Sequence, residues 1–375
     1  VKLAAWAAII GVAAAIATAG GVWVLRGGAA ARLTLAPSGY DEIAGWRDDR
    51  VADAVPAFLK SCAAFLRKPD DAPLDAAARG ADFGRVGEWR DPCVVAAALP
   101  AGDDAAARRF FEGAFMPLLA GNNGASEGLF TGYFEITLTG SRRRGGRFQT
   151  PLYRRPADPA RYARAEIEGG ALAGQGLELL WVDDPIDAFF LEIQGAGRVR
   201  LREGGTVRVG YDGSNRRRYV AVGRLLVERG ALPREKLTMA AIRRWMSAHP
   251  QEAAELRRAN PSYVFFREIA GAGPIGAERV VLTPQRSLAV DRAFLPLGVP
   301  IWLDARQRFG SATIRRLMVA QDTGGAIKGP VRGDLYCGGG AGAGAAAGAM
   351  NALGHYYLLL PRPIARRAIN SAAAD

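Results

Sequence analysis

The segment LMVAQDTGGAIKGPVRGDLYCG, residues 317–338, joins an apolar β run to a glycine-rich polar stretch. The run LMVAQD ends at Asp322, and Thr323, Gly324 and Gly325 follow it. A carboxylate that ends a rigid strand beside glycine backbone is open to close approach by a ligand. The segment therefore predicts an acidic site built on a β framework.

Other β runs extend this framework. Short apolar runs separated by Gly and Pro occur at 262–269, 278–284, 299–305 and 315–322. Upstream, residues 129–140 alternate as a strand does, and residues 188–211 predict two more strands joined by a turn at Glu203-Gly204-Gly205. We expect a β-barrel formed mainly by the last third of the chain, with packed helices and an inserted second β domain.

Helices are expected where apolar residues recur at helical spacing. One covers 51–67, and another follows Asp103-Asp104, with Phe115 and Leu118 inward and Gly121 as its stop. The other expected helices cover 216–229, 239–247 with Thr238 as its cap, and 250–259. We assign no chemistry to these helices.

The chain has 375 residues, enough for two domains, and a net charge of +12. This charge suits an anionic partner such as nucleic acid, an acidic membrane or a wall polymer with carboxylates. Heavy arginine use in a GC-rich genome explains it equally well. Because the sequence contains no RNA-recognition signature or zinc finger, we predict no nucleic-acid partner.

Residues 3–25 carry no charge and are long enough to span a bilayer as a helix. Two interpretations stay open: an uncleaved inner-membrane anchor, which the length favours, or a signal peptide cut after Ala31. Residues 1–31 are thus an anchor or signal segment. Both interpretations export the rest of the chain to a periplasm-facing position in the cell envelope.

The cysteines fit an exported protein better than a metal site. Cys62 and Cys93 are 31 positions apart, and an oxidising compartment permits a disulfide between them, which leaves Cys337 unpaired. Three cysteines and two histidines without paired ligand spacing do not form a persuasive metal site. We predict neither a metal nor an organic cofactor.

Carboxylates are the remaining candidates for catalysis, and Asp291, Asp322 and Asp334 stand out by context. Converging acids disfavour mutual ionisation, so one pKa can rise enough to keep a proton near neutral pH, as a general acid requires. In the alternative interpretation these acids cap turns or pair with Arg292 and Arg332.

A second group of residues suits a sugar. Gln194 ends what we interpret as an apolar strand before Gly195, and Thr131, Gly132 and Tyr133 form a tight polar segment. Aromatic faces with amide and hydroxyl groups match the apolar faces and hydroxyl edges of carbohydrate rings. Taken singly, each of these residues is also compatible with a structural role.

Taken together, the motifs resemble the membrane-bound lytic murein transglycosylase A family with its C-terminal three-aspartate domain. The matching segments run from Phe130 to about Pro361 and include FTGYFE, LLWVDDPIDAFFLEIQGAGRVRL, NPSYVFFRE, LTPQRSLAVDRAFLPLGVPIWLD, LMVAQDTGGAIKGPVRGDLYCG and HYYLLLPR. Two departures are that the family's Gln-Gly-Ser-Gly is Gln194-Gly195-Ala196-Gly197 here, and that the N-terminal region lacks the lipid-bearing cysteine of well-known members.

The resemblance implies a mainly β fold in which residues 35–135 plus 261–365 form a double-psi β-barrel domain with helices. Residues 136–260 form an inserted β-rich domain, and the glycan lies in a groove between the two. The family's catalytic aspartate corresponds to Asp322, and its other two named aspartates to Asp291 and Asp334. The implied groove residues are Thr131, Gly132, Tyr133, Gln194, Gly324, Gly325 and Lys328.

The implied activity is cleavage of the β-1,4 bond between N-acetylmuramic acid and N-acetylglucosamine without water, which forms a 1,6-anhydromuramyl product. The implied partners are peptidoglycan glycan strands, the membrane through the N-terminal segment, and unidentified cell-wall synthesis or division proteins. Two alternatives remain: a hydrolase that uses Asp322 as acid and Asp334 as base, and a glycan-binding module without catalysis.

Overall fold

The computed structural model describes residues 30–233, 236–308 and 311–372. The predicted anchor or signal segment, residues 1–31, lies almost wholly outside the described residues. Among the residues that are described, no helix has the length and apolarity needed to cross a membrane.

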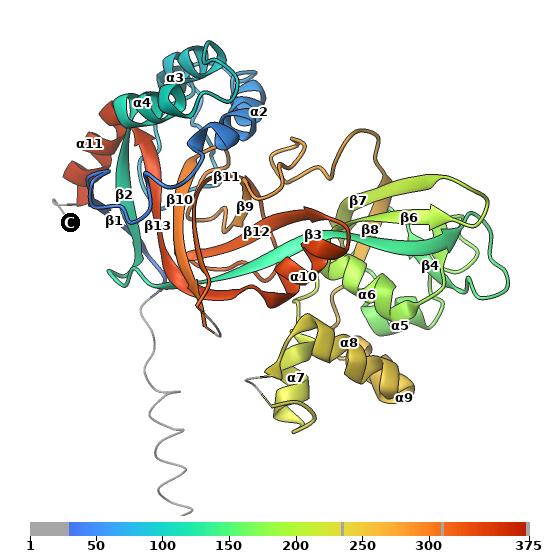
Figure 1. Ribbon diagram of the computed structural model, residues 1–375. Helices are drawn as coiled ribbons and strands as arrows, with labels where there is room; N and C mark the ends of the chain where they lie inside the picture. Colours follow the sequence, from blue (N-terminus) through green and yellow to red (C-terminus); the bar gives the residue numbers. More distant parts are fainter. Residues whose placement is uncertain (1–29, 234–235, 309–310, 373–375) are drawn as a thin grey trace, which may run out of the picture.

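Six strands pair in a closed ring in the described part of the chain (Figure 1). In ring order they are β13 (Asn351–Pro361), β10 (Pro300–Gln307), β11 (Thr313–Asp322), β9 (Ser287–Val290), β12 (Arg332–Gly339) and β3 (Gly128–Ser141). Strand β3 also pairs with β13, and this contact closes the ring. Strands β2 (Phe115–Asn122) and β1 (Leu33–Pro37) extend the sheet outward from β13. The strands expected at 129–140, 299–305 and 315–322 are therefore confirmed.

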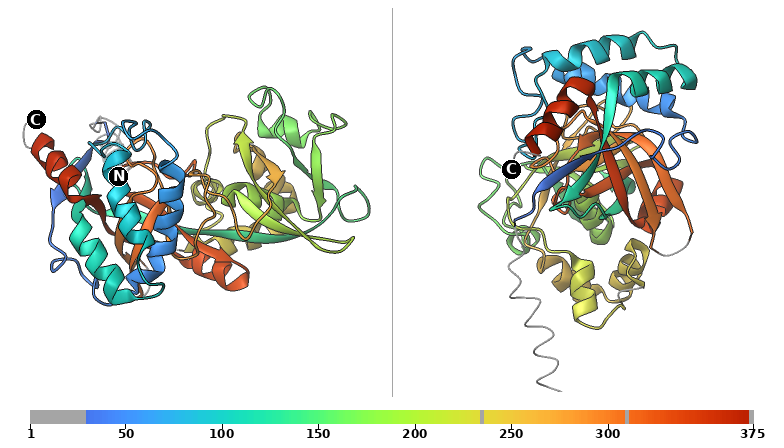
Figure 2. Two further views of the ribbon diagram at one scale, coloured as in Figure 1. Left: turned by 90° about the horizontal axis from the view of Figure 1, so that it is seen from above. Right: turned by 90° about the vertical axis from the view of Figure 1, so that its left-hand side faces the viewer.

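Four helical segments cover one end of the ring; they face the viewer in the left view of Figure 2 and lie at the top in the right view. This helical cap consists of η1 (Val51–Ala54), α2 (Val55–Phe65), α3 (Gly87–Ala97) and α4 (Asp104–Ala114). The rings of Phe58, Phe111 and Phe115 pack together in it, and one apolar cluster joins them to Trp302 and Tyr356 of the ring strands. Burying each such side chain contributes about 1.5–3 kcal/mol, so the cap and the ring share one core.

The second lobe is built on the far half of β3, which leaves the ring and runs across the molecule in Figure 1. There β3 pairs with β6 (Ala196–Leu201), and β6 is followed in the sheet by β7 (Thr206–Ser214) and β8 (Val264–Glu268). Strands β4 (Thr150–Tyr153) and β5 (Glu178–Val182) complete this sheet. The remaining helices of the lobe are α5 (Arg164–Glu168), α6 (Pro185–Gln194), α7 (Val222–Glu228), α8 (Met239–Ala248) and α9 (Pro250–Arg258). Leu138, Phe189 and Phe266 belong to a separate apolar cluster, so this lobe has its own core.

Two more helices pack on the ring. Helix α10 (Ala341–Ala349) forms from the low-complexity Gly-Ala stretch and contacts β3 and β12. Helix α11 (Arg362–Ala372) follows β13 directly and buries Ile364, Ala365 and Ala368. Helix α10 therefore covers ring strands, while α11 packs against β1, β2 and the end of β13.

Four expectations about local structure were wrong. The second helix ends at Ala114 rather than at Gly121, and Leu118 lies on strand β2. Pro117 explains the early end, because proline and the residue before it both disfavour helix. The helix expected over 216–229 begins only at Val222.

Gln194 ends helix α6, not a strand. The helix signals are present in the sequence: Asp184 caps the first turn, Pro185 follows it, and Gly195 ends the helix at φ +76°. The run at 278–284 is not a strand either. Its backbone turns back on itself, with Arg279 at φ +65° and a single bridge between Ile275 and Val281.

The predicted disulfide between Cys62 and Cys93 is present and joins α2 to α3, while Cys337 is free and buried. Closing a loop with a sequence separation of 31 restricts the unfolded chain. We expect the double variant Cys62→Ala/Cys93→Ala to lose about 3 kcal/mol of unfolding free energy in urea titrations. Non-reducing peptide mapping of protein purified from the cell envelope checks the pairing directly. Free, alkylated thiols at both positions would contradict it.

Candidate active site

Two of the three aspartates flank one short strand. In the pairing register, Ala289 of β9 is opposite Asp322 of β11 on one side and opposite Asp334 of β12 on the other. Residues in register point to the same face of a sheet, and neighbouring strands lie about 4.8 Å apart. The two aspartates therefore share a face, with Cα atoms about 10 Å apart.

Strand β3 supplies the side chains next to these carboxyls. Thr131 is in register with Asp334 across the parallel β12–β3 pair, and Tyr133 lies two residues further along the same face. Gly132 lies between them and points the other way, where a Cβ would be 2.9 Å from Ala347 Cα of α10. Gly132 thus makes room for a helix and is not directed at the aspartates.

Three donors hold the Asp322 carboxylate. The Tyr133 hydroxyl donates to Oδ2 at 2.8 Å, and the backbone N–H groups of Ala277 and Thr323 each donate to Oδ1 at 2.9 Å. Burial nevertheless raises the pKa of Asp322 above its ordinary value, and the three hydrogen bonds only partly oppose this rise. The side chain is half-buried, so it keeps access to solvent or substrate.

Asp334 has a different environment. Thr131 Oγ1 donates to Asp334 Oδ1 at 2.7 Å, and Arg332 Nη2 donates to Thr131 Oγ1 at 2.8 Å. Burial raises the pKa of Asp334 to about 6, the nearby Arg332 and the Thr131 hydrogen bond lower it, and the charge of Asp322 raises it. At neutral pH Asp334 is therefore mostly ionised.

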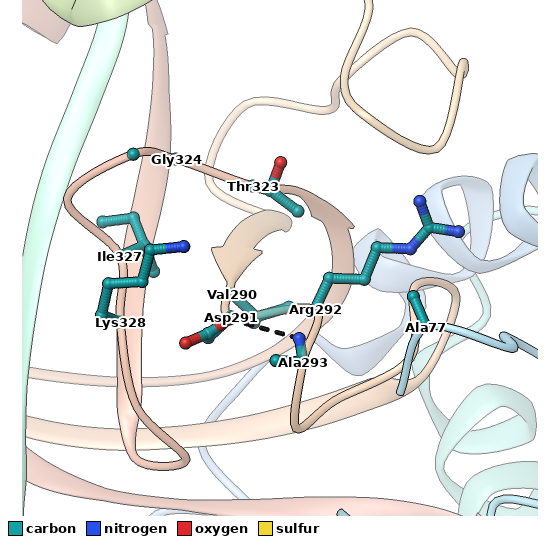
Figure 3. A pocket seen from close by; sticks show the side chains of 10 residues that line it. Ala77, Val290, Asp291, Arg292, Ala293, Thr323, Gly324, Ile327 and Lys328 are labelled. Carbon is teal, nitrogen blue, oxygen red and sulfur yellow. Dashed lines mark hydrogen bonds between the residues drawn. The ribbon is translucent and has the colours of Figure 1, made fainter. Parts of the chain in front are cut away.

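Asp291 holds a loop in place. It is buried, and it accepts hydrogen bonds from the backbone N–H groups of Gly329 at 2.8 Å and Ala293 at 3.2 Å. It lines a pocket of about 480 Å³ (Figure 3). The other lining residues are Ala77, Val290, Arg292, Ala293, Thr323, Gly324, Gly325, Ile327 and Lys328. The structure thus brings three predicted binding residues, Gly324, Gly325 and Lys328, to this pocket beside Asp322.

Gln194 is buried, and its Oε1 accepts the backbone N–H of Phe134 at 2.9 Å. Its amide therefore holds β3 where that strand leaves the ring, just beyond Tyr133. The alternative interpretation of the acids as structural groups holds in part. Asp291 does cap a turn, but Arg292 pairs with Asp75 instead, at 2.7 Å.

One contributor to the site has no sign in the sequence. The N–H of Ala277 reaches Asp322 from a position just before the strand expected at 278–284. A backbone donor carries no side-chain signal, so only the folded chain reveals it. As a whole, the site offers two neighbouring carboxyl groups whose pKa values are both raised by burial, that of Asp334 to about 6.

Two family models match the chain: the MltA specific insert domain over residues 129–267 and the 3D domain over residues 286–360. The chain is 38% identical over 269 residues to membrane-bound lytic murein transglycosylase A of Vibrio cholerae, a match that covers 70% of this chain and 72% of that protein. The solved structure of a membrane-bound lytic murein transglycosylase from Agrobacterium tumefaciens has a TM-score of 0.80 at 30% identity and covers 89% of this chain and 99% of its own. Escherichia coli MltA with bound chitohexaose has a TM-score of 0.65 at 28% identity, covering 88% and 91%.

The Tyr133 hydrogen bond should be measurable as a pKa change. Replacing Tyr133 with Phe removes a donor that favours the ionised carboxylate, so the pKa of Asp322 should rise by about one unit. Carbon-13 NMR titration of the aspartate carboxyls measures this, with Asp322→Asn as the assignment standard. Tyr336→Phe is the matched control, since that ring lies 5.3 Å from the Tyr133 ring. Identical Asp322 titrations in both variants would contradict the assigned role of Tyr133.

Proposed function

The chain belongs to the membrane-bound lytic murein transglycosylase A family, and from this membership we propose that Asp322 is its single catalytic acid and base. The chain is a peptidoglycan lytic transglycosylase: it cleaves the β-1,4 bond between N-acetylmuramic acid and N-acetylglucosamine without water. One observation carries the assignment of Asp322. It is the acid that lies at the end of a ring strand, is held by three donors and is raised in pKa by burial.

In the first step, protonated Asp322 donates its proton to the glycosidic oxygen, and the C1–O bond breaks as positive charge develops at C1. The resulting carboxylate is stabilised by Tyr133 and by the N–H groups of Ala277 and Thr323. These donors are already in place before the charge forms, so little reorganisation is needed.

In the second step, ionised Asp322 removes the proton from the C6 hydroxyl of the muramyl sugar, and that oxygen attacks C1. The product is a 1,6-anhydromuramyl end, and Asp322 is protonated again. An ordinary glycosidase requires two carboxyl groups, because water or the enzyme supplies the attacking atom. Here the substrate supplies it, so one carboxyl group suffices.

Asp334 and Asp291 would support this chemistry indirectly. The charge of Asp322 raises the pKa of Asp334, and by the same repulsion a carboxylate at Asp334 would favour the protonated form of Asp322. Asp291 holds the loop that contains Gly324, Gly325 and Lys328 through the N–H of Gly329. We place these three loop residues, together with Thr131, Tyr133 and Gln194, along the path of the glycan.

For the architecture, we propose that the closed ring is a double-psi β-barrel formed by residues 35–135 plus 261–365. Residues 136–260 would be the inserted substrate-binding domain, with the glycan between the two. One apolar cluster in the ring and cap and another in the second lobe support this division except at β8 (Val264–Glu268), whose Phe266 belongs to the cluster of the second lobe. The oligosaccharide in the Escherichia coli MltA structure supports a glycan as the ligand.

The hydrolase alternative has one observation in its favour. The pKa of Asp334 is about 6, so this residue is ionised at neutral pH and would be able to activate water. The reaction product separates the two mechanisms. In oxygen-18 water, transglycosylation yields unlabelled anhydromuropeptides, whereas hydrolysis yields labelled reducing ends that are heavier by one water.

We expect Asp322→Asn to lower turnover of purified peptidoglycan by at least about 100-fold, because the amide keeps the shape but has no transferable proton. Binding of chito-oligosaccharide should survive. Asp334→Asn and Asp291→Asn are the controls, which should slow the reaction without changing its product. Mass analysis of released muropeptides measures both rate and product. Full activity of Asp322→Asn would refute the assignment.

We also propose that residues 3–25 remain on the mature protein and hold it in the inner membrane. The uncharged run is long, Arg26 bounds it, and the A-x-A site lies further downstream. Membrane fractionation should recover the full chain with inner membranes and a variant lacking residues 1–31 in the soluble fraction. N-terminal sequencing of the native protein is the second measurement. A mature start at Arg32 would indicate a cleaved signal peptide and contradict the proposal.

A further inference from the structure

A tight turn formed by residues 276–279 contacts the end of strand β11. The N–H of Arg279 donates to Gly276 O at 2.8 Å and closes the turn. The turn binds β11 twice: Glu278 N–H donates to Gln321 O at 3.1 Å, and Ala277 N–H donates to Asp322 Oδ1 at 2.9 Å. One of the three donors to Asp322 therefore depends on where this turn lies.

The side chain of Glu278 anchors the turn to the helical cap. Ser61 of α2 donates its hydroxyl to Glu278 Oε2 at 2.6 Å. The other oxygen, Oε1, lies against Gly298. A Cβ added to Gly298 would be 2.9 Å from this oxygen and 2.9 Å from the ring of Phe65. The carboxyl group thus fills a space between α2, β11 and the loop before β10.

This anchor ends a chain of buried hydrogen bonds in which every donor points toward Glu278. The N–H of Thr283 donates to Ser287 Oγ, and Ser287 donates to Gln321 Oε1. Gln321 Nε2 donates to Ser61 Oγ at 2.9 Å, and Ser61 donates to Glu278. Ser61, Ser287 and Gln321 are fully buried. A buried network with all members satisfied rigidifies its surroundings, which here include the residue before Asp322.

The charged groups near Glu278 are few among the described residues. Burial raises the pKa of Glu278 to about 8, Ser61, Gln321 and the charge of Lys68 lower it, and the charge of Asp75 raises it. The charge of Glu278 in turn raises the pKa of Arg292. At neutral pH the anchor is therefore mostly a neutral carboxylic acid, and it places little charge beside Asp322.

We propose that Glu278 is a positioning residue for the reaction: it fixes the 276–279 turn so that the N–H of Ala277 donates to the catalytic Asp322. The inference rests on the proposed function of Asp322. Without the anchor the turn shifts, and Asp322 loses a donor that stabilises its carboxylate form. Asp322 then holds its proton more tightly and becomes a weaker acid. The other polar groups that face it, Tyr133 of β3 and Asp334 of β12, stay in place.

The test compares Glu278→Ala with Glu278→Gln in the full chain acting on purified peptidoglycan. Glu278→Ala should lower kcat about tenfold at unchanged KM, and the alkaline limb of its pH profile should move up by about one unit. Carbon-13 NMR should show the same upward shift for Asp322. Glu278→Gln should behave as the wild type near neutral pH, because a neutral amide keeps an acceptor for Ser61.

Glu112→Ala is the matched control. Glu112 of α4 accepts the Trp46 indole N–H at 2.7 Å, so its loss removes a part-buried hydrogen bond in the same cap, on a different helix from Ser61. This control should lower the Tm and leave the Asp322 pKa unchanged. If Glu278→Ala does not fold, Ser61→Ala replaces it, since that variant removes the donor to the anchor and should shift the Asp322 pKa in the same direction.

An unshifted Asp322 pKa in the folded variant, Glu278→Ala or Ser61→Ala, would overturn the proposal whatever happens to the Tm. Failure of the proposed function looks different. A shifted Asp322 pKa with unchanged kcat would show that the turn positions Asp322 but that Asp322 is not the catalytic acid, and the positioning role in the reaction would fall with it.

Discussion

Strand β3 is paired along one half with β12 and along the other half with β6, and the rest of the structure depends on this shared ladder. The first half closes the ring by its contact with β13 and presents Thr131 and Tyr133 to the two aspartates. The second half carries the core of the other lobe. A hydrogen-bonded strand cannot shift in register without moving every side chain on it, so the pairing of β3 fixes which of its residues face the two aspartates.

Burial and hydrogen bonding act in opposite directions at Asp322. Burial favours the protonated acid that the proposed first step requires, while Tyr133, Ala277 and Thr323 favour the carboxylate that the proposed second step requires. One residue that serves as both acid and base benefits from a balance between these forces. Burial also raises the pKa of Asp334, to about 6, although Arg332 and the Thr131 hydrogen bond lower it.

Two buried polar networks support the backbone around Asp322 without taking part in the proposed reaction. Gln194 binds the backbone of Phe134 just beyond Tyr133, and the chain from Thr283 to Glu278 ends at the turn that donates to Asp322. Both networks connect elements far apart in sequence: α6 with β3, and α2 with β11. The helical cap therefore has a part in the site although it contributes no side chain to Asp322.

The sequence by itself determined the strands around Asp322, the Cys62–Cys93 pair and the residues of the acidic site, because apolar alternation, spacing and motif order are local properties. It misassigned Gln194 and the run at 278–284, since a short apolar run fits a helix, a strand or a buried turn equally well. Only the tertiary structure decided that Asp322 and Asp334 flank Ala289, that Tyr133 donates to Asp322, and that the Ala277 N–H reaches it. These contacts depend on strand register and on backbone direction, which arise when distant segments pack and leave no mark on residue type.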